Sequence, residues 1–481
     1  MRLTSLGHAA VLVETGTERI LFDPWLTQRL DRFWEHHPPL PDDLVRRVLD
    51  EGVDYVVLSH HHYDHHHFPS LLRLVDGADV DFDDSPRQSS GVTCVYPAGP
   101  VPPQLTASGL GHQAIAWTLR RFGFERLHPV TPGDTVTLGG ATLRTFPSAV
   151  SFPEMSVLVE TADASVMLCG DALLHEATVA AFQRDDAPRL DAVFVPAHSV
   201  SPPGVLTERR ALTDPDAVRA RAVANFDRYV GTLPATVTVP SSFGWRVSGD
   251  GERDYSWCNR TMFPFTPTEA LARLDELGRD GLLWGPGQVI EVADGKAVLT
   301  EGPVAPDAYD FDEVYAEVRL EPGTPVPPFD ASLDRYGSQT RPADELLREV
   351  LDRLVATDYW YRALDDGAGR HVVSLYEDGA EGGAGDAAED GTGGETAFLL
   401  DPVAGRVTRL GPGPARSHVA GGEGWTEIAA STLEAMLGAD LLFGSSFGLW
   451  ASDGVLLSAV FHHPSFYTRH VDRALREGAG S

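Results

Sequence analysis

The feature that constrains this chain most is a run of histidines placed directly after a short apolar segment. Residues 55–58 read Tyr-Val-Val-Leu, which is typical of a strand buried on both faces. Residues 59–67 then read Ser-His-His-His-Tyr-Asp-His-His-His. A loop that leaves a buried strand can direct alternate side chains at one centre, and imidazole and carboxylate groups are ligands for zinc, iron and manganese. The spacing H-x-H-x-D-H therefore predicts a metal site built from His60, His62, Asp64 and His65.

A histidine tract on the surface is the alternative, and it would need no buried strand beside it. Here the upstream strand, the interposed Asp64 and a helix expected at 68–75 all agree with a metal site. We expect His60 and His62 to face one cation, and Asp64 and His65 to face a second. The remaining histidines of the run are expected to lie behind the ligands or to face solvent: His61, His66 and His67.

The mixture of short strands, hairpins and helices predicts an α/β (α+β) chain in which helices cover sheets. Strands are expected at 2–6, 10–14, 19–22, 55–58, 92–96, 135–138, 142–146, 156–160, 166–169, 192–196, 372–376 and 396–400, and helices at 40–51, 68–75, 113–122, 172–183, 214–229, 342–355 and from Thr266 onward. Stretches rich in Pro and Gly predict a linker at 301–335. We therefore expect one domain over 1–300 and an accessory α+β region over 336–481, in which the Gly-, Ala- and acid-rich stretch 378–395 is a disordered loop.

Acidic residues outnumber basic ones by 70 to 38, which gives a net charge of −32. Such a surface repels nucleic acid and anionic membranes, because no basic stripe can displace counterions from phosphates. Solubility alone is the simpler interpretation of this charge. Cys94, Cys169 and Cys258 lie far apart, so neither a disulfide framework nor a thiolate zinc cluster is expected. No apolar run approaches the ~18 residues that span a bilayer, and no signal-peptide pattern is visible, so we expect a cytoplasmic protein.

The pattern H-x-H-x-D-H after a hydrophobic strand resembles the metallo-β-lactamase superfamily. Residues 7–14, Gly-His-Ala-Ala-Val-Leu-Val-Glu, and residues 20–25, Ile-Leu-Phe-Asp-Pro-Trp, narrow the resemblance. They are similar to the branch that contains the L-ascorbate-phosphate lactonases and the CMP-N-acetylneuraminate hydroxylases. The resemblance covers about residues 1–300 and implies an αββα sandwich with a dinuclear metal site.

This resemblance implies further ligands. A bridging Asp at the end of a strand matches Asp171, which follows the apolar residues 166–168, and a late His after an apolar strand matches His198. The superfamily pattern thus implies two divalent cations, with Asp64 and Asp171 as the catalytic carboxylates.

The sequence departs from the superfamily at a third ligand, which is usually a His before the strand that leads to the bridging Asp. The stretch 145–156 holds no His; Glu154 is its strongest ligand, and Ser148 and Ser151 are weaker candidates. The alternative is that Glu154 faces solvent and that one metal position lacks a ligand. A carboxylate restores negative charge and suits a harder cation, which favours iron, with zinc or manganese as the alternatives.

A Glu in this place resembles the diiron β-hydroxylases of carrier-bound amino acids, although those enzymes carry the domain at the C-terminal end. The sialic acid hydroxylases carry a Rieske domain, and no Cys-x-His…Cys-x-x-His pattern occurs here. The favoured interpretation is an iron-dependent oxygenase of a small polar or carrier-bound substrate, which would take its electrons from a separate reductase or from the substrate itself. A zinc- or manganese-dependent hydrolase of a lactone, amide or phosphoester is the alternative, and a ligand-binding relic is a lesser one.

Several residues outside the histidine run are candidates for supporting roles. Asp23 could accept the N–H of a ligand histidine and fix its tautomer, or it could simply be a turn residue before Pro24. Other candidates could line the cavity or contact the substrate, with ordinary packing as the alternative: His8, His175, Trp245, Asn259 and Arg260. The C-terminal region is expected to act as a lid or as a dimerisation element, so a homodimer is one expectation.

Overall fold

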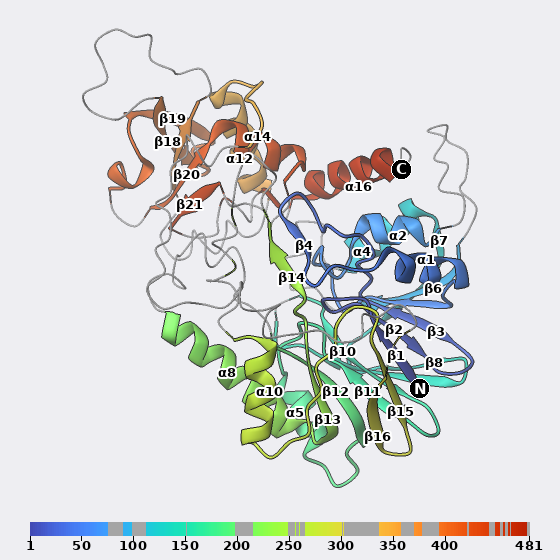
Figure 1. Cartoon of the computed structure of the whole chain (residues 1–481). Helices are drawn as coiled ribbons and strands as arrows, with labels where there is room; N and C mark the ends of the chain where they lie inside the picture. The colour runs from blue at the N-terminus through green and yellow to red at the C-terminus, as the bar shows by residue number, and fades with distance from the viewer. Residues whose placement is uncertain are drawn as a thin grey trace.

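The computed structural model of the chain is drawn in Figure 1. The structure describes residues 1–75, 90–98, 112–150, 152–197, 215–248, 255, 259, 265–300, 302, 336–356, 370–377, 394–420, 423–441, 448–452, 456, 460–461 and 463–478. Among these residues, no helix combines the length and the apolar content needed to cross a lipid bilayer.

The first sheet is mixed and contains the strand that leads into the histidine run. Its order is β16-β15-β1-β2-β3-β5-β6-β7, and β3, β5, β6 and β7 run parallel. The strands are β1 (Arg2–Ser5), β2 (Val11–Glu14), β3 (Arg19–Phe22), β5 (Tyr55–Val57), β6 (Ser90–Pro97), β7 (Phe124–Val130), β15 (Val289–Ala293) and β16 (Lys296–Thr300). Because β3 and β5 are parallel neighbours, the segments that follow them emerge at the same edge of the sheet.

The second sheet packs against the first and carries the other half of the candidate site. Its order is β13-β12-β11-β10-β9-β8. The strands are β8 (Thr135–Leu138), β9 (Ala141–Pro147), β10 (Met155–Glu160), β11 (Ser165–Leu168), β12 (Leu190–Pro196) and β13 (Ala235–Ser241). Side chains of both sheets share one buried cluster, in which Phe22 and Val57 of the first sheet lie with Val157 and Phe194 of the second.

Helices cover the outer face of each sheet (Figure 1). The first sheet is covered by α1 (Asp42–Glu51), α2 (Phe68–Arg73) and α4 (His112–Phe122), and the second by α5 (Glu176–Phe182), α8 (Pro215–Thr232) and α10 (Pro267–Glu276). Helix α10 begins with the expected signals: Thr266 and Glu269 form a capping box, and Pro267 stands at the first helical position. The layers are helices, sheet, sheet and helices, so the predicted αββα sandwich is confirmed.

The C-terminal region has its own sheet, with the order β19-β18-β17-β20-β21. Its elements are α12 (Ala343–Ala356), β17 (His371–Tyr376), β18 (Glu395–Asp401), β19 (Arg406–Pro412), a 3₁₀ turn (Ala415–Ser417), β20 (Gly424–Ala429), α14 (Ala430–Gly438), β21 (Leu449–Ala451) and α16 (Pro464–Gly478). The acidic loop was predicted to extend to residue 395, but Glu395 already begins β18 because it pairs with Tyr376 of β17. Residues 378–393 of that loop lie outside the described residues, as does the predicted linker apart from Gly302.

The C-terminal region shares buried clusters with the sandwich. Trp25 and Trp34 lie in one cluster with Leu346 of α12 and Met436 of α14. Val471, Ala474 and Leu475 of α16 lie in the same cluster as the helices that cover the first sheet. In Figure 1, α16 extends from the C-terminal region across α2 and α4. Two apolar clusters thus pack the C-terminal region against the sandwich.

Three local differences from the sequence-based expectation lie in α5, in β7 and in a short strand pair. The helix expected at 172–183 begins only at Glu176, because Leu174 forms a β-bridge with Ser148 and the His175 side chain caps the helix by accepting from Ala177 N–H at 3.0 Å. Strand β7 was not predicted, because its charged residues and Pro129 leave only its two ends buried. A short strand pair, β4 (Trp34–His36) with β14 (Trp245–Val247), was also not predicted.

The shared packing of α16 can be tested by a small deletion in its buried face. Val471 is fully buried, so Val471→Ala leaves a cavity and should lower the free energy of unfolding by about 2 kcal/mol. Urea unfolding followed by tryptophan fluorescence measures this loss. Val403→Ala is the matched control, because Val403 is 72% exposed and its truncation should change stability by less than about 0.5 kcal/mol. Equal midpoints for the two variants would show that α16 is not packed as described.

Candidate metal centre

The histidine run forms a tight loop between the end of β5 and the start of α2. The loop is closed by backbone hydrogen bonds from His65 N–H and His66 N–H to His62 O, at 3.1 and 2.8 Å. His60 and His65 are fully buried, whereas the side chain of His62 is exposed. The ring centroid of His60 lies 4.4 Å from that of His62 and 4.3 Å from that of His65. The loop therefore brings three of the four predicted histidine and aspartate ligands within one small volume.

Asp23 anchors this loop to the end of the parallel neighbour β3. Its buried carboxylate accepts hydrogen bonds from Ser59 N–H at 2.7 Å and from Ser59 Oγ at 2.6 Å. The same carboxylate lies 2.7 Å from His65 Nδ1. This contact assigns the proton to His65 Nδ1 and leaves Nε2 facing the other way. Asp23 therefore contacts one of the predicted ligand histidines, His65.

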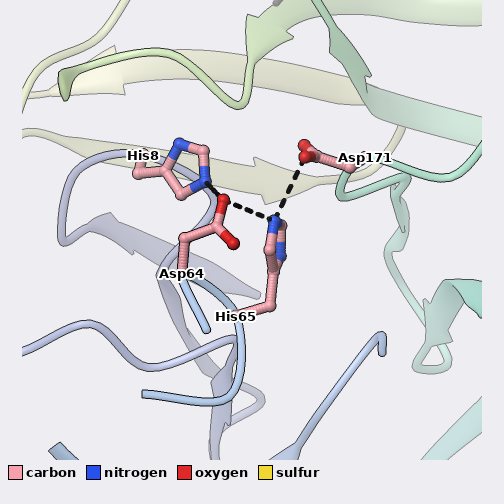
Figure 2. Close-up of side chains that lie close together, drawn as sticks. All are labelled: His8, Asp64, His65 and Asp171. Carbon is pink, nitrogen blue, oxygen red and sulfur yellow. Dashed lines mark hydrogen bonds and ion pairs between the residues drawn. The ribbon is translucent and has the colours of Figure 1, made fainter. Parts of the chain in front are cut away.

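Carboxylates converge on the Nε2 side of His65 (Figure 2). His65 Nε2 lies 3.3 Å from Asp171 Oδ2 and 3.5 Å from Asp64 Oδ2. Asp171 reaches this point from the turn after β11, where Gly170 has the positive φ of +55°. On the far side of Asp64, its Oδ2 lies 3.2 Å from His8 Nε2. The four facing atoms of His8, Asp64, His65 and Asp171 all lie within 4.8 Å of one another.

Glu154 is buried beside the histidine loop, just before β10. Its side chain is 4% exposed, and its Oε1 lies 3.5 Å from His60 Nδ1. The next residue, Met155, donates its backbone N–H to Ser59 O at 3.1 Å, which ties this segment to the loop. Burial raises the pKa of Glu154 to about 7, against a smaller lowering by its contact with Ser148. The alternative in which Glu154 faces solvent is therefore wrong.

The buried polar atoms of this cluster fit a bound cation. Among the described residues, His60 Nε2 and Glu154 Oε2 are buried and have no hydrogen-bond partner. Leaving such atoms without a partner costs free energy that coordination to a cation would recover. Burial, with the neighbouring His65 and His62, holds the pKa of His60 well below its usual value, so its ring is neutral and offers a lone pair.

The pKa of His65 reflects the negative charge of the carboxylates around it. Burial lowers its pKa, but Asp64, Asp171 and Asp23 outweigh burial and raise the pKa well above the usual value. In the metal-free protein a proton on His65 therefore balances the carboxylates. A cation at this position would replace that proton, so the donor set favours cation binding more strongly as the pH rises.

The other residues predicted from the sequence to line the cavity or bind metal lie outside the His8, Asp64, His65 and Asp171 cluster or outside the described residues. Trp245 packs next to the site, with its ring centroid 5.2 Å from that of His8 and 4.2 Å from that of Trp34. Asn259 uses its amide to bind both the N–H and the C=O of Val247, at 2.7 and 2.8 Å, so this side chain holds β14 in place. His175 is engaged as the cap of α5. Two candidates lie outside the described residues: His198 and Arg260.

Two of the three spare histidines of the run are buried. His66 and His67 are both fully buried, so the solvent-facing interpretation is wrong for these two. His67 contacts Ser70 Oγ at 2.7 Å and Leu30 O at 3.1 Å, which fixes the start of α2. His61 is partly exposed, and its ring packs edge-on against Phe152.

Two residues that pack at the site were not predicted from the sequence. Tyr63, inside the histidine loop, packs against His470 of α16 with ring centroids 4.7 Å apart, and no local signal links positions so distant in sequence. Phe152 packs with its ring centroid 5.0 Å from that of His62 and 6.0 Å from that of His60. Its place directly before Pro153 and Glu154 could have suggested an apolar wall for the loop.

Comparison with known proteins agrees with this architecture. Residues 2–200 match the family model described as the beta-lactamase superfamily domain. This match spans less than half of the chain, and it confirms the superfamily resemblance that the histidine pattern predicted for the N-terminal part. The matched residues include the candidate cluster of His8, Asp64, His65 and Asp171, which could hold a metal ion.

Particular relatives match over short segments. A metal-dependent hydrolase from Aeropyrum pernix is 42% identical over 64 residues, which cover 13% of this chain and 22% of that protein. The cytidine monophosphate-N-acetylneuraminic acid hydroxylase from Danio rerio is 38% identical over 74 residues, 15% of this chain and 12% of the hydroxylase. The chain thus matches less than a quarter of the length of either relative. The crystal structure of CmlA, a diiron beta-hydroxylase from Streptomyces venezuelae, aligns at 17% identity with a TM-score of 0.40, over 59% of this chain and 52% of that one.

The raised pKa of Glu154 predicts a specific pH dependence of stability in the metal-free protein. Between its usual pKa of 4.5 and its value of about 7, the folded protein binds one more proton than the unfolded chain. The stability from this group is fully present below pH 4.5 and is lost as the pH rises through about 7. The loss amounts to about 1.4 kcal/mol for each unit of pKa shift.

This dependence is measured as the difference in unfolding free energy between the wild type and Glu154→Gln in urea. The difference should change between about pH 5 and about pH 8, because only the wild type loses the proton. Glu125→Gln is the control, since Glu125 is exposed and its replacement should leave the pH profile unchanged. Parallel pH profiles for wild type and Glu154→Gln would contradict the burial of an ionisable group at this position.

Proposed function

We propose that this protein is an iron-dependent oxygenase that hydroxylates a small polar or carrier-bound substrate at a dinuclear site. One cation position would be held by His60, His62 and Glu154, and the second by Asp64 and His65, with Asp171 between them and His198 as a further ligand. The observation that carries the proposal is Glu154, a buried carboxylate beside His60 where a histidine is the usual superfamily residue.

The ligand chemistry supports iron over zinc. A set with three carboxylates, Asp64, Asp171 and Glu154, is harder and more anionic than a set in which histidine replaces Glu154. Iron held by such a set supplies the redox chemistry that O₂ activation needs, whereas zinc has no redox chemistry. The protein's own part is to orient the ligands, through Asp23 and Ser59, and to cover one side of the loop with Phe152.

Hydroxylation requires electrons from outside the site. In the proposed reaction one oxygen atom of O₂ enters a C–H bond of the substrate to give an alcohol, and the other leaves as water. This balance consumes two electrons and two protons for each O₂. We propose that a separate reductase supplies the electrons, and that the acidic surface of the chain, with a net charge of −32, favours a reductase with a basic docking face.

A zinc- or manganese-dependent hydrolase is the second candidate. It is favoured by the relative from Aeropyrum pernix, a metal-dependent hydrolase, which is 42% identical over 64 residues. In this case Asp64 and Asp171 would orient a water molecule toward a lactone, amide or phosphoester, and no electron donor would be needed. The hydroxylase from Danio rerio, 38% identical over 74 residues, supports the oxidative alternative over a segment of similar length.

Elemental analysis distinguishes the two candidates. Protein purified from cells supplied with both iron and zinc is expected to contain about two iron atoms per chain. Its optical spectrum should change when the anaerobically reduced protein is exposed to O₂. Zinc at both positions, with no response to O₂, would contradict the oxygenase proposal and would direct the substrate search to lactones, amides and phosphoesters.

Two variants test the assignment of the ligands. His62→Ala should lower the metal content by about one cation per chain and abolish activity, since it removes a ligand of the first position. Glu154→Gln should lower iron affinity, because it removes an anionic ligand and leaves the neutral side chain in the same volume. Their matched controls are His128→Ala and Glu125→Gln, which change exposed residues outside the loop. A His62→Ala protein with full metal content would show that the histidine run is not the metal site.

A further inference from the structure

We propose that His8 is a direct ligand of the second cation position, beside Asp64, His65 and Asp171. This inference rests on the proposed metal-dependent function, and it adds to the site a ligand from the first loop of the chain. His8 follows β1 and precedes β2, far from the histidine run in sequence. The superfamily resemblance gave it no ligand role, and the four side chains nevertheless point toward one another (Figure 2).

The distances within the cluster match the edges of a coordination shell. Two ligand atoms about 2.1 Å from one cation lie about 3.0 Å apart in octahedral geometry and about 3.4 Å apart in tetrahedral geometry. The successive separations here, from His8 to Asp64, from Asp64 to His65 and from His65 to Asp171, are 3.2, 3.5 and 3.3 Å. The separation of His8 Nε2 from Asp64 is thus similar to the separations between the other predicted ligands.

The backbone at His8 is held in an uncommon conformation that aims its ring at the cluster. His8 has a φ of +46°, in the left-handed region that non-glycine residues rarely adopt. The preceding Gly7 has a φ of +83°, and a Cβ added there would lie 2.6 Å from His36 Nδ1, so only glycine fits. On the other side, His8 forms a β-bridge with Phe243. Strained backbone of this kind persists where the surroundings fix it, and it gathers at functional sites.

Packing fixes the ring of His8 as well as its backbone. The side chain is 1% exposed and lies between Trp25, with ring centroids 5.9 Å apart, and Trp245, with centroids 5.2 Å apart. Among the described residues, His8 Nδ1 is buried and has no hydrogen-bond partner. His65 differs, because Asp23 holds its Nδ1. A ligand histidine without such a partner is a weaker donor, so His8 should be the more easily displaced of the two.

A simple hydrogen bond from His8 to Asp64 would give the same distance, and one substitution separates the two roles. His8→Gln keeps an N–H donor for the Asp64 carboxylate but replaces imidazole by an amide, which is a poor ligand for these cations. His8→Asn provides a second variant, because asparagine tolerates the left-handed backbone but is too short to reach the cation. Folding of both variants is checked by circular dichroism.

The experiment loads the full-length protein with Co²⁺ and measures its visible spectrum, its metal stoichiometry and its affinity by competition with a chelator. If His8 is a ligand, both variants should bind the second Co²⁺ about 10- to 100-fold more weakly and should show an altered spectrum. His128→Ala should behave as the wild type does. Two Co²⁺ ions bound to His8→Gln with wild-type affinity and spectrum would overturn the proposal.

His62→Ala separates failure of this inference from failure of the proposed function. If His62→Ala loses one Co²⁺ while the His8 variants bind two as the wild type does, the metal site stands and only the role of His8 is wrong. If His62→Ala also binds two ions as the wild type does, the histidine run is not the metal site and the ligand assignment behind the proposed function is contradicted. If the His8 variants and His62→Ala each lose a different ion, two distinct positions are occupied and His8 belongs to the second.

Discussion

The buried contact of Asp23 with Ser59 and His65 is the interaction on which the rest of the site depends. It joins the ends of two parallel strands, β3 and β5, and it sets both the path of the histidine loop and the tautomer of His65. A carboxylate with no exposed surface is stable only when its oxygens are fully engaged. Here three hydrogen bonds provide that engagement, and they fix the orientation of His65, a predicted metal ligand.

In the metal-free protein, burial keeps some groups of the site neutral, whereas neighbouring carboxylates keep another group positively charged. His60 and Glu154 lie where burial disfavours charge, so the pKa of the first is low and that of the second is raised to about 7. His65 lies among three carboxylates, which keep its ring positive in the metal-free protein. A pair of cations would suit both environments, because it would stabilise the charged form of Glu154 and would replace the proton on His65. The arrangement of donors is therefore electrostatically suited to binding cations.

Much of the sandwich and the histidine loop could be predicted from sequence, because both depend on local patterns. The apolar run at 55–58 and the spacing of His60, His62, Asp64 and His65 are readable within a dozen residues. The place of His8 could not be predicted, since it depends on a left-handed backbone and on the approach of Phe243 from another sheet segment. The edge strand β7 was missed because tertiary pairing overrides the weak strand preference of charged residues and proline.

The contact of Tyr63 with His470 has a consequence for the order in which the protein is assembled. The histidine loop is made early in synthesis, but part of the packing behind it comes from α16, near the other end of the described chain. Domains usually fold as they leave the ribosome, from the N-terminus onward. In this chain the loop cannot reach its final packing until α16 has been made and has docked. Insertion of a cation at the proposed site is therefore expected to follow the synthesis and docking of α16.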